Sequence, residues 1–413
     1  MTPSSKRIFA KNEEISNDTH ETQLNNNDLI IGPSGAGKTT GYVIPNLINT
    51  YGSMIVADTK GNLHRKFSNY LKNNGYTVRV IDLSDLKHSC SYNPLDYIDY
   101  TSPTDYSQQD VISLAAILCP VKTERDPFWE KSAQTVIASL IAYVLEALPR
   151  EEHNMVNVTR LYRTLTTETG KNLFRSLEME LPGSYAVKLY HLYAPTTSVE
   201  KTWACITQFI SNALWLFDFN ESERVFGRKS DFDFRELGEK NCVFFLNLSD
   251  TDRSMDTIVD VFYTQALQSL VRLADSKEDN RLAIPVRIIL DDFATNTYIP
   301  NFDKIISVIR SRDISVSVIL QSISQLRSLY NEGQATTIMN NCDHILYLGG
   351  QDIETANFIS HRTNKTPETI LNQSVEKAYL ITRGQKAKEV IKNGPNDYTI
   401  PDNSDKNDDN VVA

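Results

Sequence analysis

Near its amino end the chain reads Gly32-Pro33-Ser34-Gly35-Ala36-Gly37-Lys38-Thr39. This octapeptide matches G-x-x-x-x-G-K-[ST], the pattern of loops whose backbone N–H groups wrap a polyphosphate. The apolar run Asp28-Leu29-Ile30-Ile31 directly before it predicts a short buried strand, and the mostly apolar residues 39–48 after it predict a helix. Strand, glycine loop and helix form the context that a phosphate-binding loop requires. The sequence therefore predicts a nucleoside triphosphate site here.

The residue types in this loop are suited to holding phosphates and a metal ion. Gly35 and Gly37 lack side chains, so the backbone can turn its N–H groups inward, and the start of the next helix adds its positive dipole end. We expect Lys38 to hold the outer phosphates and the Thr39 hydroxyl to hold Mg²⁺. The expected nucleotide contacts are Gly32, Pro33, Ser34, Gly35, Ala36, Gly37, Lys38, Thr39 and Thr40.

Composition sets broad limits on the class of protein. The 413 residues are 40% hydrophobic, which allows a sizeable core in one large domain or two to three small ones. A formal net charge of −10 argues against general coating of nucleic acid, although net charge does not report a local basic surface. The five cysteines are scattered, without C-x-x-C pairs, which fits reduced thiols in a cytosolic protein and suggests no zinc site. The sequence shows no signal peptide, and its most apolar long stretch, 136–145, is too short for a membrane span.

Apolar runs separated by turn signals predict the remaining strands. Residues 53–58 and 76–82, with a predicted helix between them, continue a parallel βαβ pattern from the first strand. From 106 to 217 helical periodicity dominates, which predicts an inserted all-α domain. Further strands are predicted at 242–248, 286–292, 314–320 and 345–348, followed by a late hairpin over 378–391.

These elements predict an α/β fold in four parts. The parts are a polar, loosely ordered lead-in over 1–27, a P-loop domain over 28–105 and 235–393, a mainly helical region over 106–234 that contains the insertion, and an acidic disordered tail over 394–413.

Two carboxylates end one of the predicted strands. Asp291 and Asp292 follow Ile288-Ile289-Leu290, the form of a Walker B strand, which we expect to lie beside the P-loop strand and to deliver its acids at the carboxyl edge of the sheet. We expect Asp291 to hold Mg²⁺ together with Thr39, and Asp292 to polarise the attacking water. Gln321 ends another predicted strand and is a candidate for sensing the γ-phosphate or its water; the alternative is a simple helix-cap region.

The motifs together resemble the type IV coupling proteins of conjugation and type IV secretion, the TraG/TraD-like hexameric ATPases related to FtsK. Two of the matching segments are absent from generic P-loop proteins: Ser91-Tyr92-Asn93-Pro94-Leu95 and Gln321-Ser322-Ile323-Ser324-Gln325-Leu326. The other segments follow in the family's order within about residues 28–391, at 32–40, 56–63, 127–129, 290–294, 309–312 and 348–350.

The resemblance implies a RecA/FtsK-like P-loop NTPase with a mostly parallel central sheet and an all-α domain inserted before the Walker B strand. It implies ATP and Mg²⁺ as cofactors, and a membrane-tethered ring of six subunits that links relaxase-bound single-stranded DNA to the type IV secretion channel. Arg310 occupies the place of an arginine that reaches the neighbouring subunit's nucleotide, with Arg312 as the nearby rival and a surface salt bridge as the alternative role of Arg310. The implied catalytic set is Lys38, Asp291, Asp292, Arg310 and Gln321.

The sequence departs from the family pattern in three places. Thr59 stands where the family usually has proline, a change of little expected cost. Asp292 stands where the family usually has glutamate, and a carboxylate one methylene shorter predicts slow hydrolysis. Family members usually begin with transmembrane helices, so their absence here points to a soluble form, a truncated gene or a fragment. We expect the chain in the cytoplasm, or at the cytoplasmic face of the bacterial membrane through a partner or a missing amino-terminal anchor.

Three classes of function remain to be separated. The leading interpretation is an ATP-driven DNA translocase or substrate receptor of a conjugative element. The alternative is an ATP-binding, weakly or non-hydrolysing adaptor that recruits the relaxase or another secretion substrate, and Asp292 favours it. A metabolic kinase or a GTPase is the third class; the sequence has no Asn-Lys-x-Asp guanine motif and no lid-like cluster of arginines.

Overall fold

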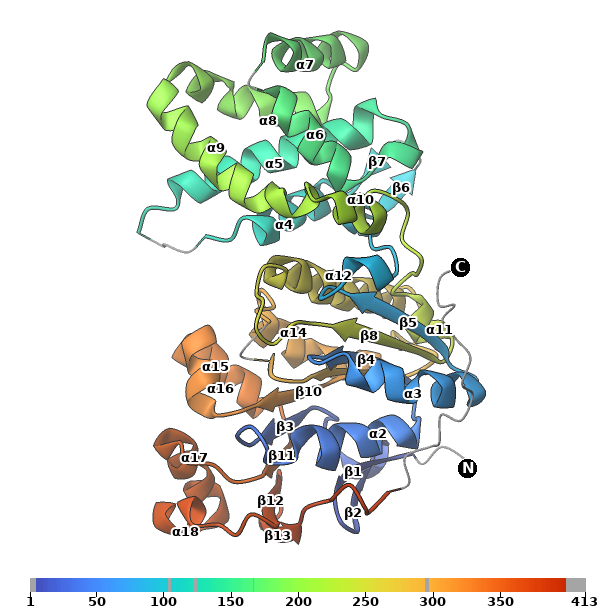
Figure 1. Cartoon of the computed structure of the whole chain (residues 1–413), viewed down its shortest axis with the longest axis vertical. Coiled ribbons are helices and arrows are strands. Elements are labelled where there is room, and N and C mark those ends of the chain that lie inside the picture. Colours follow the sequence, from blue (N-terminus) through green and yellow to red (C-terminus); the bar gives the residue numbers. More distant parts are fainter. Residues whose placement is uncertain (1–4, 103–104, 122–124, 166, 294–296, 399–413) are drawn as a thin grey trace. The chain divides into compact units, whose positions relative to one another are not determined.

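The computed structural model describes residues 5–102, 105–121, 125–165, 167–293 and 297–398 (Figure 1). The chain divides into two compact units. The sheet unit comprises the described residues of 1–84, 234–253 and 267–413, and the helical unit those of 85–233 and 254–266. The chain passes between the units four times, and the last passage, between 266 and 267, falls inside helix α12 (Asp256–Asp275).

The sheet unit is built on nine strands in the order β13-β12-β11-β3-β10-β9-β4-β8-β5. The strands from β11 through β5 pair in parallel, and β12 and β13 add an antiparallel hairpin at one edge. This confirms the α/β fold with a mostly parallel sheet. The strand bounds are β3 (Asp28–Ile31), β4 (Ser53–Asp58), β5 (Thr77–Asp82), β8 (Cys242–Asn247), β9 (Val286–Leu290), β10 (Ile314–Leu320), β11 (His344–Tyr347), β12 (Lys377–Thr382) and β13 (Lys388–Ile391).

The order of the central strands corrects one expectation. Val318 of β10 pairs with Leu29 of β3 on one side and with Leu290 of β9 on the other. The Walker B strand β9 is therefore separated from the P-loop strand by β10, and the prediction that they are neighbours is wrong. Apolar patterning shows that a strand is buried but not which strand it pairs with, because any two buried parallel strands have compatible edges.

Both faces of the sheet are buried. One face contributes alternate residues such as Ile30, Phe245 and Ile319 to a single hydrophobic cluster. The same cluster includes side chains from α2 (Ile44–Asn49), α3 (Asn62–Asn73) and the strand β1 (Lys6–Ala10). Residues of the opposite face, such as Leu29 and Phe244, are also fully buried, as expected for parallel strands covered on both sides.

The amino-terminal segment is ordered where the structure describes it, which corrects the expectation of a loose lead-in over 1–27. It forms the hairpin of β1 and β2 (Glu13–Ser16), followed by a one-turn helix α1 (Thr19–Thr22). Phe9 is buried in the core of the sheet unit, and Arg7 pairs with the buried Asp28. These long-range contacts, rather than the polar composition, determine the order of the segment. At the other end, the prediction of a disordered tail over 394–413 is wrong for residues 394–398, because Asp397 pairs with Lys11 and Tyr398 bonds to Thr40; residues from 399 onward lie outside the described residues.

The helical unit surrounds one long helix. Helix α5 (Phe128–Ala147) packs against four others, and its residues 136–145 are all buried. Among the described residues, no helix combines the length and the hydropathy that crossing a membrane requires. The other elements are the hairpin β6 (Tyr100–Ser102) and β7 (Asp105–Tyr106) and the helices α4 (Gln108–Leu118), α6 (Met155–Leu165), α7 (Glu168–Glu180), α8 (Tyr185–Tyr193), α9 (Glu200–Leu214) and α10 (Asn220–Phe226).

The helical unit begins at Asp85, earlier than the expected boundary at 106. The reason is the segment Ser91-Tyr92-Asn93-Pro94-Leu95, which bonds to distant parts of this unit. The Tyr92 hydroxyl donates to Gln265 Oε1 (2.6 Å), and Gln265 Nε2 donates to the Pro94 carbonyl (2.8 Å). This family-specific segment thus has a structural role, because it ties the entry of the helical unit to the helix α12 that leaves it.

Candidate nucleotide-binding site

Three strands deliver their polar ends to one edge of the sheet. The P-loop follows β3, Asp291 follows β9 and Gln321 follows β10. Because these strands are parallel, their carboxyl ends share the edge at which open α/β sheets bind ligands. The strand between β3 and β9 therefore does not prevent their loops from meeting.

The P-loop has the backbone shape expected of a phosphate cradle. Gly35 and Gly37 have φ angles of +78° and +93°, a region that residues with a Cβ rarely adopt. The Gly32 N–H donates to the Leu320 carbonyl at 3.1 Å, which continues the β3–β10 pairing into the loop. The loop then enters a π-helical turn, η1 (Thr39–Val43), and the helix α2.

Lys38 lies inside this loop. Its side chain is only 7% exposed, and Nζ donates to the carbonyls of Gly32 (2.9 Å) and Pro33 (3.2 Å). The same Nζ lies 3.6 Å from Asp292 Oδ1. The ammonium group is thus held at the centre of the loop, close to the second Walker B carboxylate.

Asp291 and Thr39 form the second contact across this edge. The Thr39 hydroxyl donates to Asp291 Oδ2 at 2.9 Å. Burial, and then the neighbouring charge of Asp292, raise the pKa of Asp291 to about 6. The Asp291 carboxylate and the Thr39 hydroxyl are hard oxygen ligands of the kind that Mg²⁺ prefers, and among the described residues no cation forms an ion pair with Asp291.

Asp292 has an unusual backbone. Its φ is +49°, in the left-handed region, which aspartate tolerates better than most side chains. Its Oδ1 is buried and accepts no hydrogen bond from the part of the chain that the structure describes. Among the described residues, this buried oxygen therefore faces the Lys38 ammonium group without a hydrogen bond.

Gln321 lies at the same end of the strands, but within the described structure no hydrogen bond joins its side chain to Lys38, Asp291 or Asp292. Its Oε1 accepts a long hydrogen bond from Gln325 Nε2 (3.5 Å). The cap of the next helix, α15 (Ile323–Leu329), is Ser322, whose hydroxyl accepts from the Gln325 N–H (3.3 Å). Gln321 itself is thus not the capping residue, and its side chain remains half-exposed at the ligand edge.

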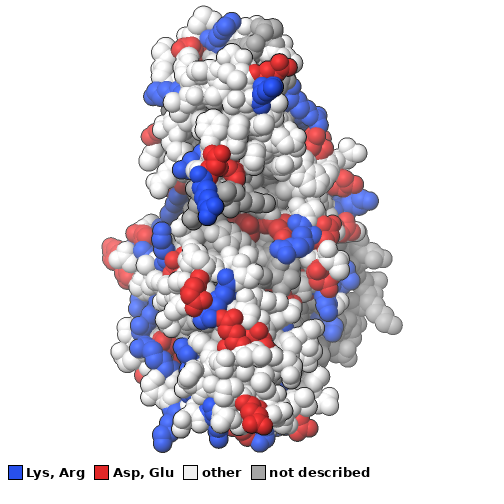
Figure 2. Space-filling model, turned by 90° about the vertical axis from the view of Figure 1, so that its left-hand side faces the viewer, with Lys and Arg blue, Asp and Glu red and all other residues white. Residues whose placement is uncertain are grey.

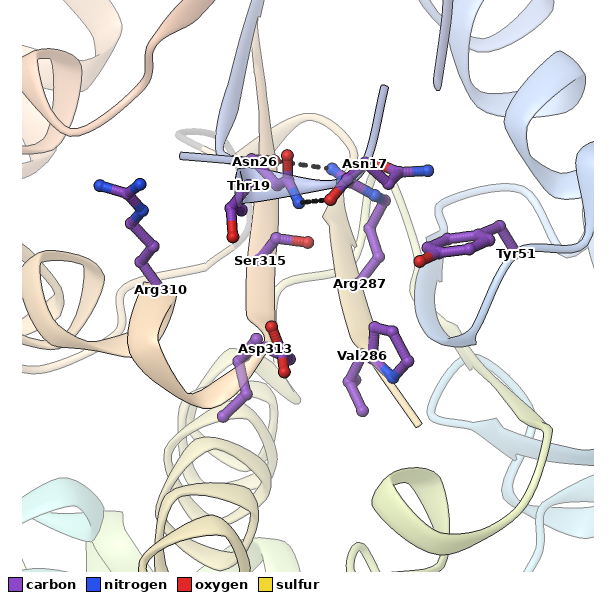
Figure 3. Close-up of a pocket in the computed structure, with 11 residues that line it drawn as sticks. Asn17, Thr19, Asn26, Tyr51, Val286, Arg287, Arg310, Asp313 and Ser315 are labelled. Atoms are coloured by element: carbon purple, nitrogen blue, oxygen red, sulfur yellow. Dashed lines mark hydrogen bonds between the residues drawn. The ribbon is translucent and has the colours of Figure 1, made fainter. Parts of the chain in front are cut away.

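Arg310 lies at the opposite end of the parallel strands, where β10 begins. It belongs to η7 (Ile309–Arg312), directly before β10, whose seven residues span about 20 Å at ~3.3 Å per residue. There it lines a small pocket of about 60 Å³ together with Asn17, Arg287 and Asp313. Figure 3 shows its guanidinium pointing away from Asn17 and Arg287. Arg310 is therefore too far away to contact a nucleotide held by the P-loop of its own chain.

The two candidate arginines differ in their partners. Arg312 pairs with Asp275 through Nε (2.7 Å) and Nη2 (3.1 Å). Arg310 is exposed, and within the described residues its guanidinium makes no ion pair. The surface salt bridge considered for Arg310 thus forms at Arg312 instead.

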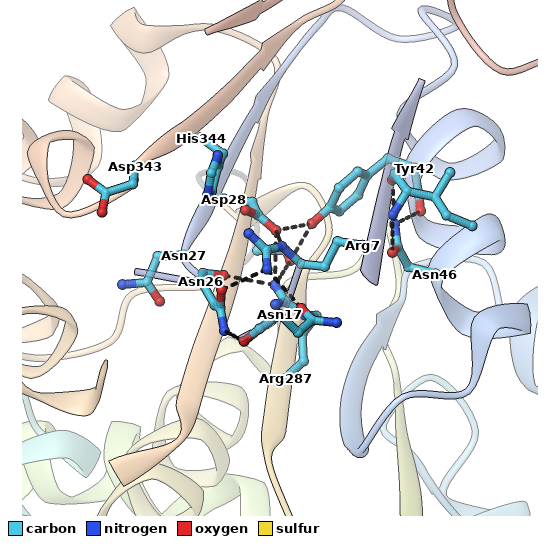
Figure 4. Close-up of polar contacts among 12 residues, drawn as sticks. Arg7, Asn17, Asn26, Asn27, Asp28, Tyr42, Asn46, Arg287, Asp343 and His344 are labelled. Atoms are coloured by element: carbon cyan, nitrogen blue, oxygen red, sulfur yellow. Dashed lines mark hydrogen bonds and ion pairs between the residues drawn. The ribbon is translucent and has the colours of Figure 1, made fainter. Parts of the chain in front are cut away.

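Sequence patterns missed a buried polar network that anchors the strand leading into the P-loop (Figure 4). Asp28, fully buried at the start of β3, accepts from the Tyr42 hydroxyl (2.6 Å) and pairs with Arg7 Nε and Arg287 Nη1 (3.0 Å each). Tyr42 lies in η1, so the network joins both flanks of the P-loop to strands β1 and β9. The available signal was an aspartate in a buried strand, which requires charged partners.

Comparisons with known proteins identify relatives of this chain. The family model described as "Type IV secretory system Conjugative DNA transfer" matches residues 6–390. Protein VirD4 of Agrobacterium fabrum is 22% identical over 339 residues, which are 80% of this chain and 48% of that protein. The chain thus spans about half the length of this relative.

Two solved structures share the fold. The unbound conjugative coupling protein TrwBdeltaN70 superposes with a TM-score of 0.69 at 16% identity, covering 94% of this chain and 89% of that one. TrwB in complex with ADP and Mg²⁺ has a TM-score of 0.64 at 16% identity, covering 88% of this chain and 84% of that one. The family match extends over nearly all described residues, so this chain belongs to the type IV secretory system conjugative DNA transfer family.

Proposed function

We propose that this chain is an ATP-dependent coupling protein of a conjugative or type IV secretion system, which delivers relaxase-bound single-stranded DNA to the transfer channel. The observation that carries the proposal is the convergence of Lys38, Thr39, Asp291 and Asp292 at one edge of the sheet, in a chain of the conjugative DNA transfer family. The complex of TrwB with ADP and Mg²⁺ supports the same ligands for this edge.

The residues at this edge fit Mg²⁺–ATP. The inward N–H groups of the loop around Gly35 and Gly37 suit a polyphosphate, and Lys38 supplies its positive charge. Thr39 and Asp291 would hold Mg²⁺, which neutralises charge on the phosphates when bound.

Asp292 is the proposed base that orients and polarises the attacking water. Its buried Oδ1 has no hydrogen-bond donor among the described residues, so it has the free lone pairs that this role requires. For Gln321, which is partly exposed at the same end of the sheet, we propose a hydrogen bond to the γ-phosphate or its water.

One observation favours a second candidate function, an ATP-binding adaptor that hydrolyses slowly or not at all and recruits the relaxase or another substrate. Asp292 has the shorter side chain and lies 3.6 Å from Lys38. An ion pair with the lysine draws the carboxylate toward the loop and away from the position of an attacking water. The two functions share the nucleotide site and differ in turnover.

The position of Arg310 supports a ring in which the active site is shared. In the proposed ring, this exposed arginine, at the end of the sheet opposite the P-loop, would act on a neighbour's nucleotide and stabilise charge on the transferring phosphoryl group. A homo-hexamer at the cytoplasmic face of the membrane, beside the secretion channel, satisfies this requirement. On the face shown in Figure 2, basic and acidic side chains of the described residues are interspersed.

Steady-state ATP hydrolysis with and without single-stranded DNA tests the proposal. A coupling ATPase gives Mg²⁺-dependent turnover that DNA stimulates, and Lys38→Ala abolishes this turnover because the charge on the phosphates is lost. An adaptor binds Mg²⁺–ATP but shows no stimulated turnover. A chain that binds no Mg²⁺–ATP, or a Lys38→Ala variant as active as the parent, would contradict both.

A further inference from the structure

The helix after the P-loop contains a proline at a position that leaves two carbonyls without their usual donors. In the π-helical turn η1 the Ile44 N–H donates to the Thr39 carbonyl, five residues earlier. Pro45 follows and has no N–H. In a π-helix the N–H of residue 45 would donate to the Thr40 carbonyl, and in an α-helix it would donate to the Gly41 carbonyl. Pro45 can make neither hydrogen bond.

The end of the described chain supplies donors to these same two carbonyls. We call residues 392–398 the C-terminal strap. The Tyr398 hydroxyl donates to the Thr40 carbonyl (2.7 Å), and Asn393 Nδ2 donates to the Gly41 carbonyl (3.0 Å). The strap runs so close that a Cβ on Gly41 would lie 3.1 Å from the Asn393 carbonyl oxygen.

A third side chain of the strap reaches the loop itself. Lys392 Nζ donates to the carbonyls of Ala36 (3.3 Å) and Leu348 (2.6 Å). Ala36 is part of the phosphate cradle, and Leu348 continues β11 beside it. Within the described chain no carboxylate pairs with Lys392, so its positive charge adds to the potential that an anion meets at the loop.

The strap is anchored to the rest of the sheet unit at several points. The Lys392 N–H donates to the Glu376 carbonyl (3.0 Å), and Lys11 Nζ pairs with Asp397 (2.7 Å). The ring of Tyr398 packs against the hydrophobic cluster under the sheet. Because its anchors lie outside the P-loop, the strap can hold the loop in position rather than merely move with it.

We propose that the C-terminal strap is a positioning element of the nucleotide site, in which Asn393, Tyr398 and Lys392 hold the P-loop and the first turn of its helix in the phosphate-binding conformation. The inference rests on the proposed function only in taking the ligand to be a nucleotide. None of the three residues needs to touch the ligand: Asn393 and Tyr398 act through the two carbonyls to which Pro45 cannot donate, and Lys392 acts through the carbonyls of Ala36 and Leu348.

Binding of Mg²⁺–ADP to the full chain, measured by calorimetry, tests the proposal. Asn393→Ala combined with Tyr398→Phe is expected to weaken affinity about tenfold, since each loses one hydrogen bond to a main-chain carbonyl. Tyr379→Phe is the matched control, because its hydroxyl contacts Glu389 on the β12–β13 hairpin and not the loop, and it should leave affinity unchanged.

Pro45→Ala separates a positioning role from general damage to the fold. It restores an N–H at residue 45, so in this background the double variant should lose at most about twofold in affinity. An equal loss in both backgrounds, or no loss in either, would overturn the proposal.

Amide hydrogen exchange measured without nucleotide tests the role of the strap independently of the proposed function. The double variant should speed exchange at residues 40–44 while the amides of β3 and β10 stay protected. If the parent chain binds no Mg²⁺–ADP, the proposed function fails, and the exchange rates still decide whether the strap holds the loop. Unchanged exchange at residues 40–44 would show that it does not.

Discussion

The Asp292 carboxylate has two competing partners, Lys38 and the water that it is proposed to polarise. Its Oδ1 faces Lys38 Nζ at 3.6 Å, yet water polarisation requires the same group to face the phosphoryl group. The backbone at φ +49° fixes the direction in which the side chain leaves the strand end. Side-chain length therefore decides which of the two contacts is stronger.

Substitutions at the two Walker B acids should separate binding from hydrolysis. Asp292→Glu should preserve or raise kcat, because the added methylene extends the carboxylate beyond Lys38. Asp292→Asn should bind Mg²⁺–ATP but not hydrolyse it, whereas Asp291→Asn should weaken Mg²⁺-dependent binding itself. The measurements are kcat and, separately, Kd with and without Mg²⁺. A kcat that falls sharply in Asp292→Glu would show that the site is built for the shorter side chain.

His344 should make stability depend on pH in a defined window. Burial lowers its pKa from 6.5 to about 4; nearby Asp28 and Asp343 oppose the shift, and Arg7 and Arg287 add to it. The unfolded chain binds the proton more tightly, so this contribution is fully present above pH 6.5 and is lost as pH falls toward 4.

The size of this effect can be measured against a variant without the imidazole. Between about pH 7 and about pH 5 the contribution amounts to about 2 kcal/mol, since one pKa unit corresponds to about 1.4 kcal/mol. Urea unfolding of His344→Leu should therefore lose about 2 kcal/mol less than the parent over this interval. An equal loss of unfolding free energy in the two proteins would mean that His344 has the same pKa in the folded and unfolded states.

At the scale of elements, strand β3 contains a buried negative charge, Asp28, whose positive partners come from other strands. Asp28 meets Arg7 from β1 and Arg287 from β9, whose side chains are only 2% and 11% exposed. The network therefore fixes β3 and the turn η1 against two neighbouring elements. A hydrophobic residue at position 28 would bury equally well but would leave both arginines unpaired.

Asp28→Asn should be strongly destabilising. It leaves two buried cations without a counter-charge, which costs about 3–5 kcal/mol of the free energy of unfolding. Urea denaturation measures this, with Glu389→Gln as the control, because the exposed pair Lys377–Glu389 contributes about 0–1 kcal/mol. An Asp28→Asn protein within about 1 kcal/mol of the parent would show that the network adds little net stability.

At the scale of the whole molecule, Arg310 and the P-loop lie at opposite ends of the parallel strands: Arg310 lies at the amino ends and the P-loop at the carboxyl ends. A ring contact joins unlike surfaces of successive subunits, so it can bring the arginine edge of one copy to the nucleotide edge of the next. In the proposed ring, hydrolysis is therefore expected to depend on contact between neighbouring subunits.

Turnover should accordingly depend on assembly. Arg310→Ala should bind ATP normally and hydrolyse it poorly, and mixing it with Lys38→Ala should restore part of the activity, because each supplies the half-site that the other lacks. Activity per chain should also rise with protein concentration. Constant activity over about a hundredfold dilution, with no rescue in the mixture, would exclude a shared site.

DNA binding should likewise be governed by charge rather than sequence. Affinity for single-stranded DNA should be independent of sequence and fall by more than about tenfold between about 50 mM and about 200 mM salt, because phosphate contacts release counterions. Fluorescence anisotropy at several salt concentrations measures this. Undetectable binding at low salt would favour the adaptor over the translocase.

The amino-acid sequence alone was enough to predict the parts whose chemistry depends on adjacent residues. The P-loop glycines, Lys38 and Thr39 are contiguous, and their backbone shape follows from local conformational preferences. Asp291 and Asp292 were identifiable because an apolar strand ends in them. The mostly parallel sheet followed in the same way from alternating apolar strands and helices.

The remaining features depend on contacts between distant residues, which local patterns do not encode. Strand β10 separates β3 from β9, Arg7 meets Asp28, and Tyr398 reaches Thr40 across 358 positions of sequence. Each of these contacts forms because burial leaves a polar group or a strand edge in need of a partner, and any of several segments has suitable chemistry. Which segment supplies the partner is settled only when the whole chain packs.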